Sequence, residues 1–112
     1  MLRKNVLRRQ KDFDLVYKKG NSVPSKHVVV LYRKNRSEET RIAFVASKKV
    51  GGSVARNRAR RLMKEALRLS GITLKPGYDY IYVARNGIDT AKCQEVGKSL
   101  VSAVRRIEVK KK

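Results

Sequence analysis

The sequence has few of the features that stabilise secreted proteins or anchor membrane proteins. Its single cysteine, Cys93, excludes an internal disulfide framework and is typical of a protein from a reducing compartment. No apolar run approaches the roughly 20 residues that cross a bilayer, and residues 1–9 lack the apolar core of a secretion signal. We therefore expect a cytoplasmic protein that has no part in a membrane.

Acidic residues are also scarce. Nine Asp and Glu residues stand against 29 Lys and Arg residues, which gives a formal net charge of +20. A chain with this charge repels itself, so we expect an anionic partner: a nucleic acid, an acidic membrane surface or an acidic protein. The hydrophobic fraction of 41% is still adequate for a core. The length predicts a single domain over 1–112, with flexible ends over 1–8 and 109–112.

Hydrophobic periodicity predicts alternating helices and strands. Two β-branched runs, 27–32 and 41–46, are separated by a short polar turn, which favours an antiparallel hairpin. Before these runs we expect a helix over 11–19, with Phe13, Val16 and Tyr17 on one face, and a short strand near Ser22 and Val23 that Pro24 should interrupt. After them we expect a helix over 53–70, with Ser53 as its N-cap, and a strand over 78–85. The last helix should be capped by Asp89 or Thr90 and should bury Val96, Leu100, Val104 and Ile107. This order predicts an α/β (α+β) two-layer sandwich, with three helices and a small mixed sheet of about four strands.

The most informative segment is 47–64, which contains seven basic residues and no acidic residue. The apolar stripe expected for its helix consists of Ala55, Ala59, Leu62, Ala66 and Leu69. The residues that fan over the opposite side are Arg56, Asn57, Arg60, Arg61, Lys64 and Arg68, whereas Arg58 lies nearer the edge of the stripe. Guanidinium groups bind phosphate through two parallel hydrogen bonds, and free amides at the helix start favour an anion. A solvated helix face is the simpler interpretation, but it does not explain the missing acids.

The run from Ser47 to Glu65 resembles the signature of the bacterial ribonuclease P protein family, in which Ser-Lys-Lys and a glycine precede an Arg-Asn-Arg helix. The similarity extends over roughly 8–107, because 11–20, 29–32 and 79–85 resemble the first helix, an aromatic-ended strand and the last strand of the family. Val28 and Val29 stand where the family often has an aromatic residue. The resemblance implies a fold related to a ribosomal-protein domain, with a left-handed connection around the Arg-Asn-Arg helix where the general rule would give a right-handed one.

The resemblance also implies a function. The chain would be the protein subunit of an endoribonuclease whose RNA subunit, using bound Mg²⁺, removes the 5′ leader of precursor tRNA. We expect a monomer in a one-to-one ribonucleoprotein. By resemblance, the residues that contact the catalytic RNA are Lys48, Lys49, Arg56, Asn57, Arg58, Arg60, Arg61 and Lys64. By resemblance, the leader lies in a cleft between the first helix and the sheet, lined by Phe13, Tyr17, Val30, Tyr32 and Val45, with Lys49, Arg60 and Lys64 at its rim.

Aromatic side chains suit a leader because they stack on any base, although Phe13 and Tyr17 would also serve as core residues and Tyr32 as a surface tyrosine. No catalytic or metal site is expected in the protein itself: His27 has no cysteine nearby, and Glu38 and Glu39 point apart in a turn. The alternatives are a ribosomal RNA binder, which would not need the aromatic cleft, and a nucleoid DNA binder, which would need a dimer interface or a groove-reading helix. A membrane-surface protein would need bulky apolar residues opposite the basic face, and a self-contained nuclease would need an active site.

Overall fold

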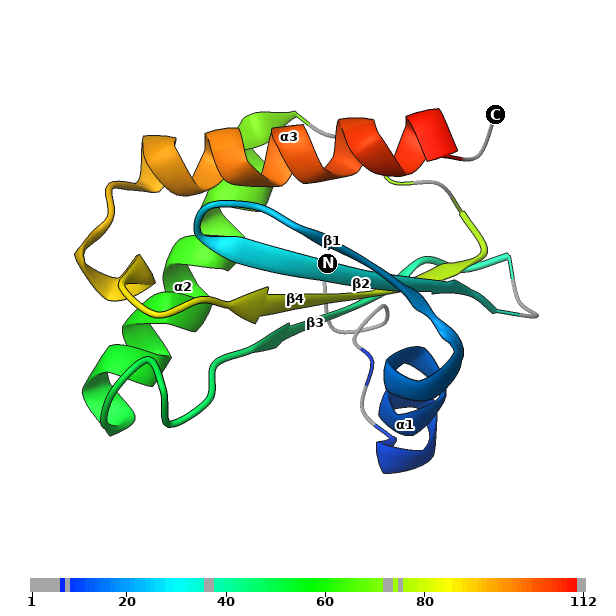
Figure 1. Cartoon of the computed structure of the whole chain (residues 1–112), viewed down its shortest axis with the longest axis horizontal. Coiled ribbons are helices and arrows are strands. Elements are labelled where there is room, and N and C mark those ends of the chain that lie inside the picture. Colours follow the sequence, from blue (N-terminus) through cyan, green and yellow to red (C-terminus); the bar gives the residue numbers. More distant parts are fainter. Residues whose placement is uncertain (1–6, 8, 36–37, 72–73, 75, 111–112) are drawn as a thin grey trace.

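The computed structural model describes residues 7, 9–35, 38–71, 74 and 76–110. A four-stranded sheet carries helices α2 and α3 on one face and helix α1 on the other (Figure 1). The elements are α1 (Gln10–Lys19), β1 (Asn21–Pro24), β2 (Val28–Lys34), β3 (Arg41–Val45), α2 (Ser53–Ser70), β4 (Tyr78–Ala84), the short 3₁₀ helix η2 (Ile88–Thr90) and α3 (Cys93–Lys110). The predicted α/β class and the predicted order of the elements are confirmed.

The sheet has the order β1-β2-β4-β3, so β4 lies between the two strands that were expected to form a hairpin. β4 pairs antiparallel with β2 and parallel with β3. The predicted pairing of 27–32 with 41–46 is therefore wrong. A short connecting turn permits a hairpin but does not require one, and β4, five of whose seven residues are buried, takes an interior position where both faces are covered.

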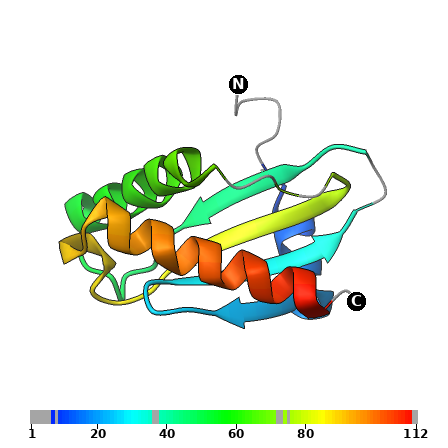
Figure 2. The ribbon, with the colours of Figure 1, turned by 90° about the horizontal axis from the view of Figure 1, so that it is seen from above.

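The connection from β3 through α2 to β4 is left-handed. In Figure 2 the helix layer lies in front of the sheet, β3 runs towards the left, and the parallel strand β4 lies below it. This is the hand that the family resemblance implied, and it is the opposite of the general preference for right-handed crossovers between parallel strands.

The edge strand β1 confirms the short strand expected near Ser22 and Val23. Its pairing with β2 extends from Asn21 opposite Tyr32 to Pro24 opposite Val29, so Pro24 ends the ladder and does not interrupt it. An edge position tolerates proline because only one side of the strand has to form ladder hydrogen bonds.

The structure describes only part of the two end segments that were expected to be flexible. Leu7 is buried and donates its backbone N–H to the carbonyl of Ile42 over 2.9 Å. Residues 109 and 110 belong to α3. The remainder of the two expected segments, 1–6, 8 and 111–112, lies outside the described residues.

Two cores lie on opposite faces of the sheet. The larger core, under α2 and α3, includes Val28, Val30 and Tyr32 from β2 with Tyr80 and Tyr82 from β4. The smaller core, under α1, consists of Leu7, Val16, Ala43 and Ile81, with Phe13, Leu31, Val45 and Val83 packed against it and partly buried. Since side chains alternate along a strand, this division decides which residues can line a surface beside α1.

The helix ends also differ from the sequence expectation. The N-cap of α2 is Gly52, and no side chain caps this end, so Ser53 is the first helical residue and not the cap. Asp89 and Thr90 lie in η2, and α3 starts at Cys93, after Lys92, whose backbone N–H is accepted by the Glu95 carboxylate at 2.9 Å. The expected end of α2 near Ser70 is confirmed, because Gly71 adopts the left-handed conformation that closes a helix.

The buried residues predicted for α3, Val96, Leu100, Val104 and Ile107, are also confirmed.

Candidate RNA-binding surfaces

Helix α2 is held by Ala59, Met63 and Ala66, which are almost completely buried. The stripe expected from the sequence ran through Leu62 and Leu69, but Leu69 is 63% exposed. At about 100° per residue, the buried direction is rotated by about 50° from the predicted one. The rotation places Arg56 at the edge of the core and turns Arg58 fully to solvent.

The predicted RNA-contacting residues therefore form one surface around the first half of α2. Lys48, Lys49, Asn57, Arg58, Arg61 and Lys64 are exposed, whereas Arg56 and Arg60 are half-buried. We call these eight residues the α2 basic surface. Within it, Arg60 donates to the side-chain oxygen of Asn57, and Arg56 approaches the hydroxyl of Ser53 at 3.5 Å. None of its seven cations forms an ion pair with any carboxylate in the part of the chain that the structure describes.

The turn before α2 places Lys48 and Lys49 beside the amino end of the helix. Val50 is buried and donates to the carbonyl of Ser47, and Gly51 donates to the carbonyl of Lys48, both at 3.1 Å. Gly51 has a φ of 144°, and an added Cβ would lie 2.9 Å from Cβ of Ala55, so this position requires glycine. The first turn of α2 contains no acidic residue, which leaves the positive end of the helix dipole uncompensated.

A second predicted surface lies beside α1. Tyr17 is 50% exposed, and burial of the rest of its ring raises the pKa of its hydroxyl. Phe13 and Val45 are partly buried on the same side of the sheet, next to Leu31 and Val83. We call these five residues the α1 apolar surface. Phe13 thus contributes to the smaller core, and Tyr17 presents the exposed ring.

The assignment of Val30 and Tyr32 to this surface is wrong. Val30 is 0% exposed and Tyr32 is 4% exposed, and both belong to the core under α2 and α3. Their neighbour Leu31 faces α1 instead. Every position from 28 to 31 is apolar, so the sequence of β2 has no alternation from which its two faces could be assigned. Leu31 and Val83 are the residues that sequence reasoning missed.

The two surfaces approach each other along the chain at the end of β3. Val45 closes β3 on the α1 side, and Lys49 follows four residues later in the exposed turn before α2. Arg60 and Lys64, also expected at the rim of the leader site, belong to the α2 basic surface on the other helix layer.

A network of charged groups fixes α1 against the sheet. Arg41 on β3 binds the buried Asp79 of β4 through two hydrogen bonds of 2.8 and 2.9 Å and reaches Asp12 of α1 at 3.2 Å. Asn35 donates to the same Asp79 carboxylate at 2.9 Å. The two carboxylates, Asp79 first through its hydrogen bond and then Asp12, raise the pKa of Arg41.

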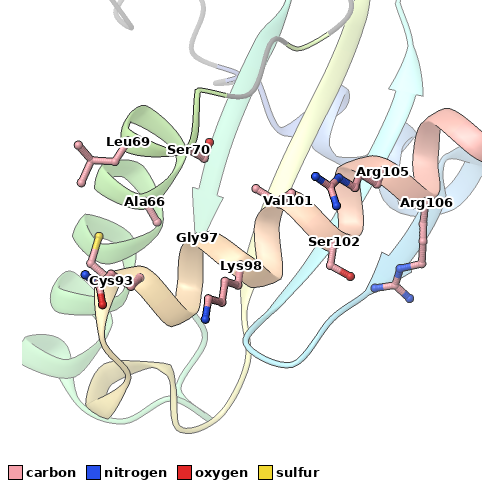
Figure 3. A pocket seen from close by; sticks show the side chains of 11 residues that line it. Ala66, Leu69, Ser70, Cys93, Gly97, Lys98, Val101, Ser102, Arg105 and Arg106 are labelled. Carbon is pink, nitrogen blue, oxygen red and sulfur yellow. The ribbon is translucent and has the colours of Figure 1, made fainter.

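An apolar groove of about 850 Å³ lies on the surface where α2 and α3 meet (Figure 3). Its lining includes Ala66 and the exposed Leu69 from α2, with Cys93, Gly97 and Val101 from α3. Leu69 therefore belongs to a surface groove and not to the core.

No cluster of three or more His, Cys, Asp or Glu side chains suited to a metal ion occurs among the described residues. Across the same part of the chain, no helix is long and apolar enough to cross a bilayer.

A family model described as "Ribonuclease P" matches residues 1–108. The chain belongs to the ribonuclease P protein family. It is 37% identical over 105 residues to the ribonuclease P protein component of Pelotomaculum thermopropionicum, with 94% of each chain covered. It is 40% identical over 104 residues to that of Clostridioides difficile, with 92% of this chain and 91% of the relative covered.

Solved structures of ribonuclease P proteins agree with this assignment. The protein from Staphylococcus aureus has a TM-score of 0.81 at 26% identity, covering 94% of this chain and 96% of that one. The protein from Thermotoga maritima has a TM-score of 0.77 at 28% identity, covering 90% and 96%. The chain is thus a protein component of ribonuclease P, the ribonucleoprotein endoribonuclease that processes the 5′ end of precursor tRNA, and it has a ribonuclease P RNA as partner.

Proposed function

We propose that this ribonuclease P protein binds the catalytic RNA through the α2 basic surface. The observation that carries the proposal is the set of seven cations that have no carboxylate partner among the described residues. They are mounted on a helix whose position is fixed by Ala59, Met63 and Ala66. A rigid cationic ridge suits structured RNA, which proteins recognise mainly by shape and phosphate contacts.

Arg56 adds a specific feature to this surface. Its Nε is buried and has no hydrogen-bond acceptor among the residues that the structure describes. A buried donor without an acceptor costs about 1–3 kcal/mol. Rotation of the Arg56 side chain towards a phosphate of the RNA would expose this donor and satisfy it, so bound RNA would recover part of that cost.

We propose that the single-stranded 5′ leader of the precursor tRNA binds the α1 apolar surface. Tyr17 offers a half-exposed ring, and Leu31, Val45 and Val83 offer partly buried aliphatic groups beside it. Stacking on an aromatic ring contributes about 1–3 kcal/mol per base and tolerates any sequence. Such binding would favour precursor tRNA over mature tRNA, because only the precursor has a leader.

The chemistry itself is proposed to belong to the RNA. The described residues contain no cluster of ligands for Mg²⁺, so their donor set does not fit a resident metal site. We infer that Mg²⁺ is held by the RNA partner and that the protein, one copy per RNA, supplies binding energy and orientation.

Reconstitution tests this division of roles. The purified protein is mixed with a bacterial ribonuclease P RNA and a precursor tRNA at an Mg²⁺ concentration too low for the RNA alone. We expect cleavage at the mature 5′ end only when protein and RNA are both present. A folded, RNA-bound protein that fails to stimulate cleavage would contradict the proposal and would favour a purely structural RNA binder.

A further inference from the structure

A second basic site lies away from both proposed surfaces, where the turn between β1 and β2 meets α3. It is a cavity of about 820 Å³. The lining residues that carry charge or can titrate are Lys26, His27, Arg85, Glu95, Lys98 and Arg106. We call this site the turn pocket.

The charges of the turn pocket do not balance. Lys26, Arg85, Lys98 and Arg106 supply four positive charges, and none of them forms an ion pair within the described part of the chain. Glu95 is the one carboxylate among the lining residues, and one of its oxygens already accepts the backbone N–H of Lys92. That hydrogen bond and the nearby positive charges lower the pKa of Glu95. Converging cations repel each other, so this arrangement favours a bound anion.

Backbone carbonyls hold the two guanidinium groups in place. Arg85 donates to the carbonyl of Ser25 at 2.9 Å, and Arg106 donates to the carbonyl of Pro24. A carbonyl fixes the direction of an arginine without cancelling its charge, and each guanidinium retains further N–H donors. His27 also lines the pocket, and its Nε2 is buried without a hydrogen-bond partner among the described residues.

Three side chains of α3 line the turn pocket in a row, and they also border the groove between α2 and α3. Lys98, Ser102 and Arg106 are spaced four residues apart, so they form a row along one side of the helix. Figure 3 shows this row on the side of α3 that faces the strand hairpin. All three residues line the turn pocket.

We propose that the turn pocket binds a backbone phosphate of the catalytic RNA, as a contact separate from the α2 basic surface. The inference rests on the proposed function, because it takes the same RNA as ligand. The lining contains no Phe, Tyr or Trp side chain, so it suits phosphate oxygens better than stacked bases. Helices α3 and α1 lie on opposite faces of the sheet (Figure 1). The pocket is lined from α3, whereas the α1 apolar surface lies beside α1. The site is thereby assigned to the catalytic RNA and not to the leader.

Charge reversal in the pocket tests the proposal against a matched control. Lys98→Glu changes α3, and Lys26→Glu changes the turn between the strands, so the two variants probe the pocket from separate elements. Lys34→Glu is the control, because Lys34 is exposed at the far end of β2 and lines neither the pocket nor either proposed surface. Circular dichroism and thermal unfolding establish that each variant is folded.

The readout is the Kd for ribonuclease P RNA as a function of salt. We expect each pocket variant to raise the Kd roughly tenfold and to reduce the slope of log K against log salt by about one unit, and the control to change the Kd no more than roughly twofold. If the pocket variants have the same Kd and salt slope as Lys34→Glu, while the unaltered protein binds the RNA, the proposal that the turn pocket binds phosphate is overturned and the proposed function still stands. Weaker binding of precursor tRNA alone, with unchanged binding of the catalytic RNA, would also overturn it. An unaltered protein that does not bind the RNA would overturn both.

Discussion

Tyr82 is buried at the centre of β4, and its hydroxyl has no hydrogen-bond partner in the part of the chain that the structure describes. Its ring stacks on Phe44, with 5.5 Å between centroids. We expect Tyr82→Phe to keep this packing and to leave the free energy of unfolding at pH 7 unchanged or higher by up to about 1 kcal/mol, because an unsatisfied hydroxyl is removed. Urea denaturation measures the change.

The same variant has an expected pH signature. Burial raises the pKa of Tyr82 far above its usual value, so the folded state keeps the proton when the unfolded state releases it. Tyr82 ionisation therefore does not affect the free energy of unfolding below pH about 10, and it lowers that free energy progressively as the pH rises above that value. Tyr82→Phe should flatten the alkaline loss of stability. Tyr17→Phe is the comparison: its ring is half-exposed and its pKa is raised less, so it should flatten the alkaline loss less than Tyr82→Phe. A loss of more than about 1 kcal/mol at pH 7 in Tyr82→Phe would show that the hydroxyl has a partner.

Tyr17 and Phe13 are expected to respond differently to truncation. Tyr17→Ala should weaken binding of leader-bearing precursor tRNA by about 1–3 kcal/mol, leave mature tRNA binding unchanged and alter stability little, because the ring is half-exposed. Tyr17→Phe keeps the ring and should keep the binding. Phe13→Ala should also lower stability, because Phe13 packs against the smaller core under α1. Binding assays with both RNAs decide between the roles: an equal loss for precursor and mature tRNA in Tyr17→Ala would contradict the stacking role.

At the scale of elements, α2 offers a direct test of which side it buries. Met63→Ala should lower the free energy of unfolding by about 2–5 kcal/mol, because the side chain is fully buried. Leu69→Ala should cost less than about 1 kcal/mol, since Leu69 is 63% exposed in the groove beside α3. Chemical denaturation of the pair measures the difference. Similar losses of stability in the two variants would contradict the observed burial and support the apolar stripe predicted from the sequence, which included Leu69.

The elements themselves were predictable from local patterns, but their neighbours were not. The periodicity of 11–19, 53–70 and 78–85 located α1, α2 and β4 to within a residue or two, because turn glycines and apolar spacing act locally. The insertion of β4 beside β3 depends on contacts between segments distant in sequence, which spacing does not encode. The faces of Val30 and Leu31 were undetermined for a related reason: a wholly apolar strand can bury either side.

At the scale of the whole molecule, three of the nine acidic residues form ion pairs among the described residues. Asp12 and Asp79 are engaged by Arg41 at the junction of α1 with the sheet, and Glu65 pairs with Arg68 beyond the α2 basic surface. Most of the cations behind the net charge of +20, those of the α2 basic surface included, therefore have no carboxylate partner among the described residues. Composition was sufficient to predict an anionic partner, and the motif predicted which helix faces it. Which side of that helix is buried could be determined only from the structure, where Met63 packs in the core.

Binding of the catalytic RNA should consequently be steeply dependent on salt. If the α2 basic surface neutralises about six phosphates, log K against log salt should have a slope of roughly −4 to −5, because each neutralised phosphate releases condensed counterions. Arg61→Ala or Lys64→Ala should each reduce the magnitude of the slope by about one unit, since both side chains are exposed on that surface. Lys34→Ala, the same loss of charge at the far end of β2, should leave the slope nearly unchanged. Filter-binding titrations from low to physiological salt measure all four proteins, and a slope near zero in the unaltered protein would show that phosphate contacts do not drive the association.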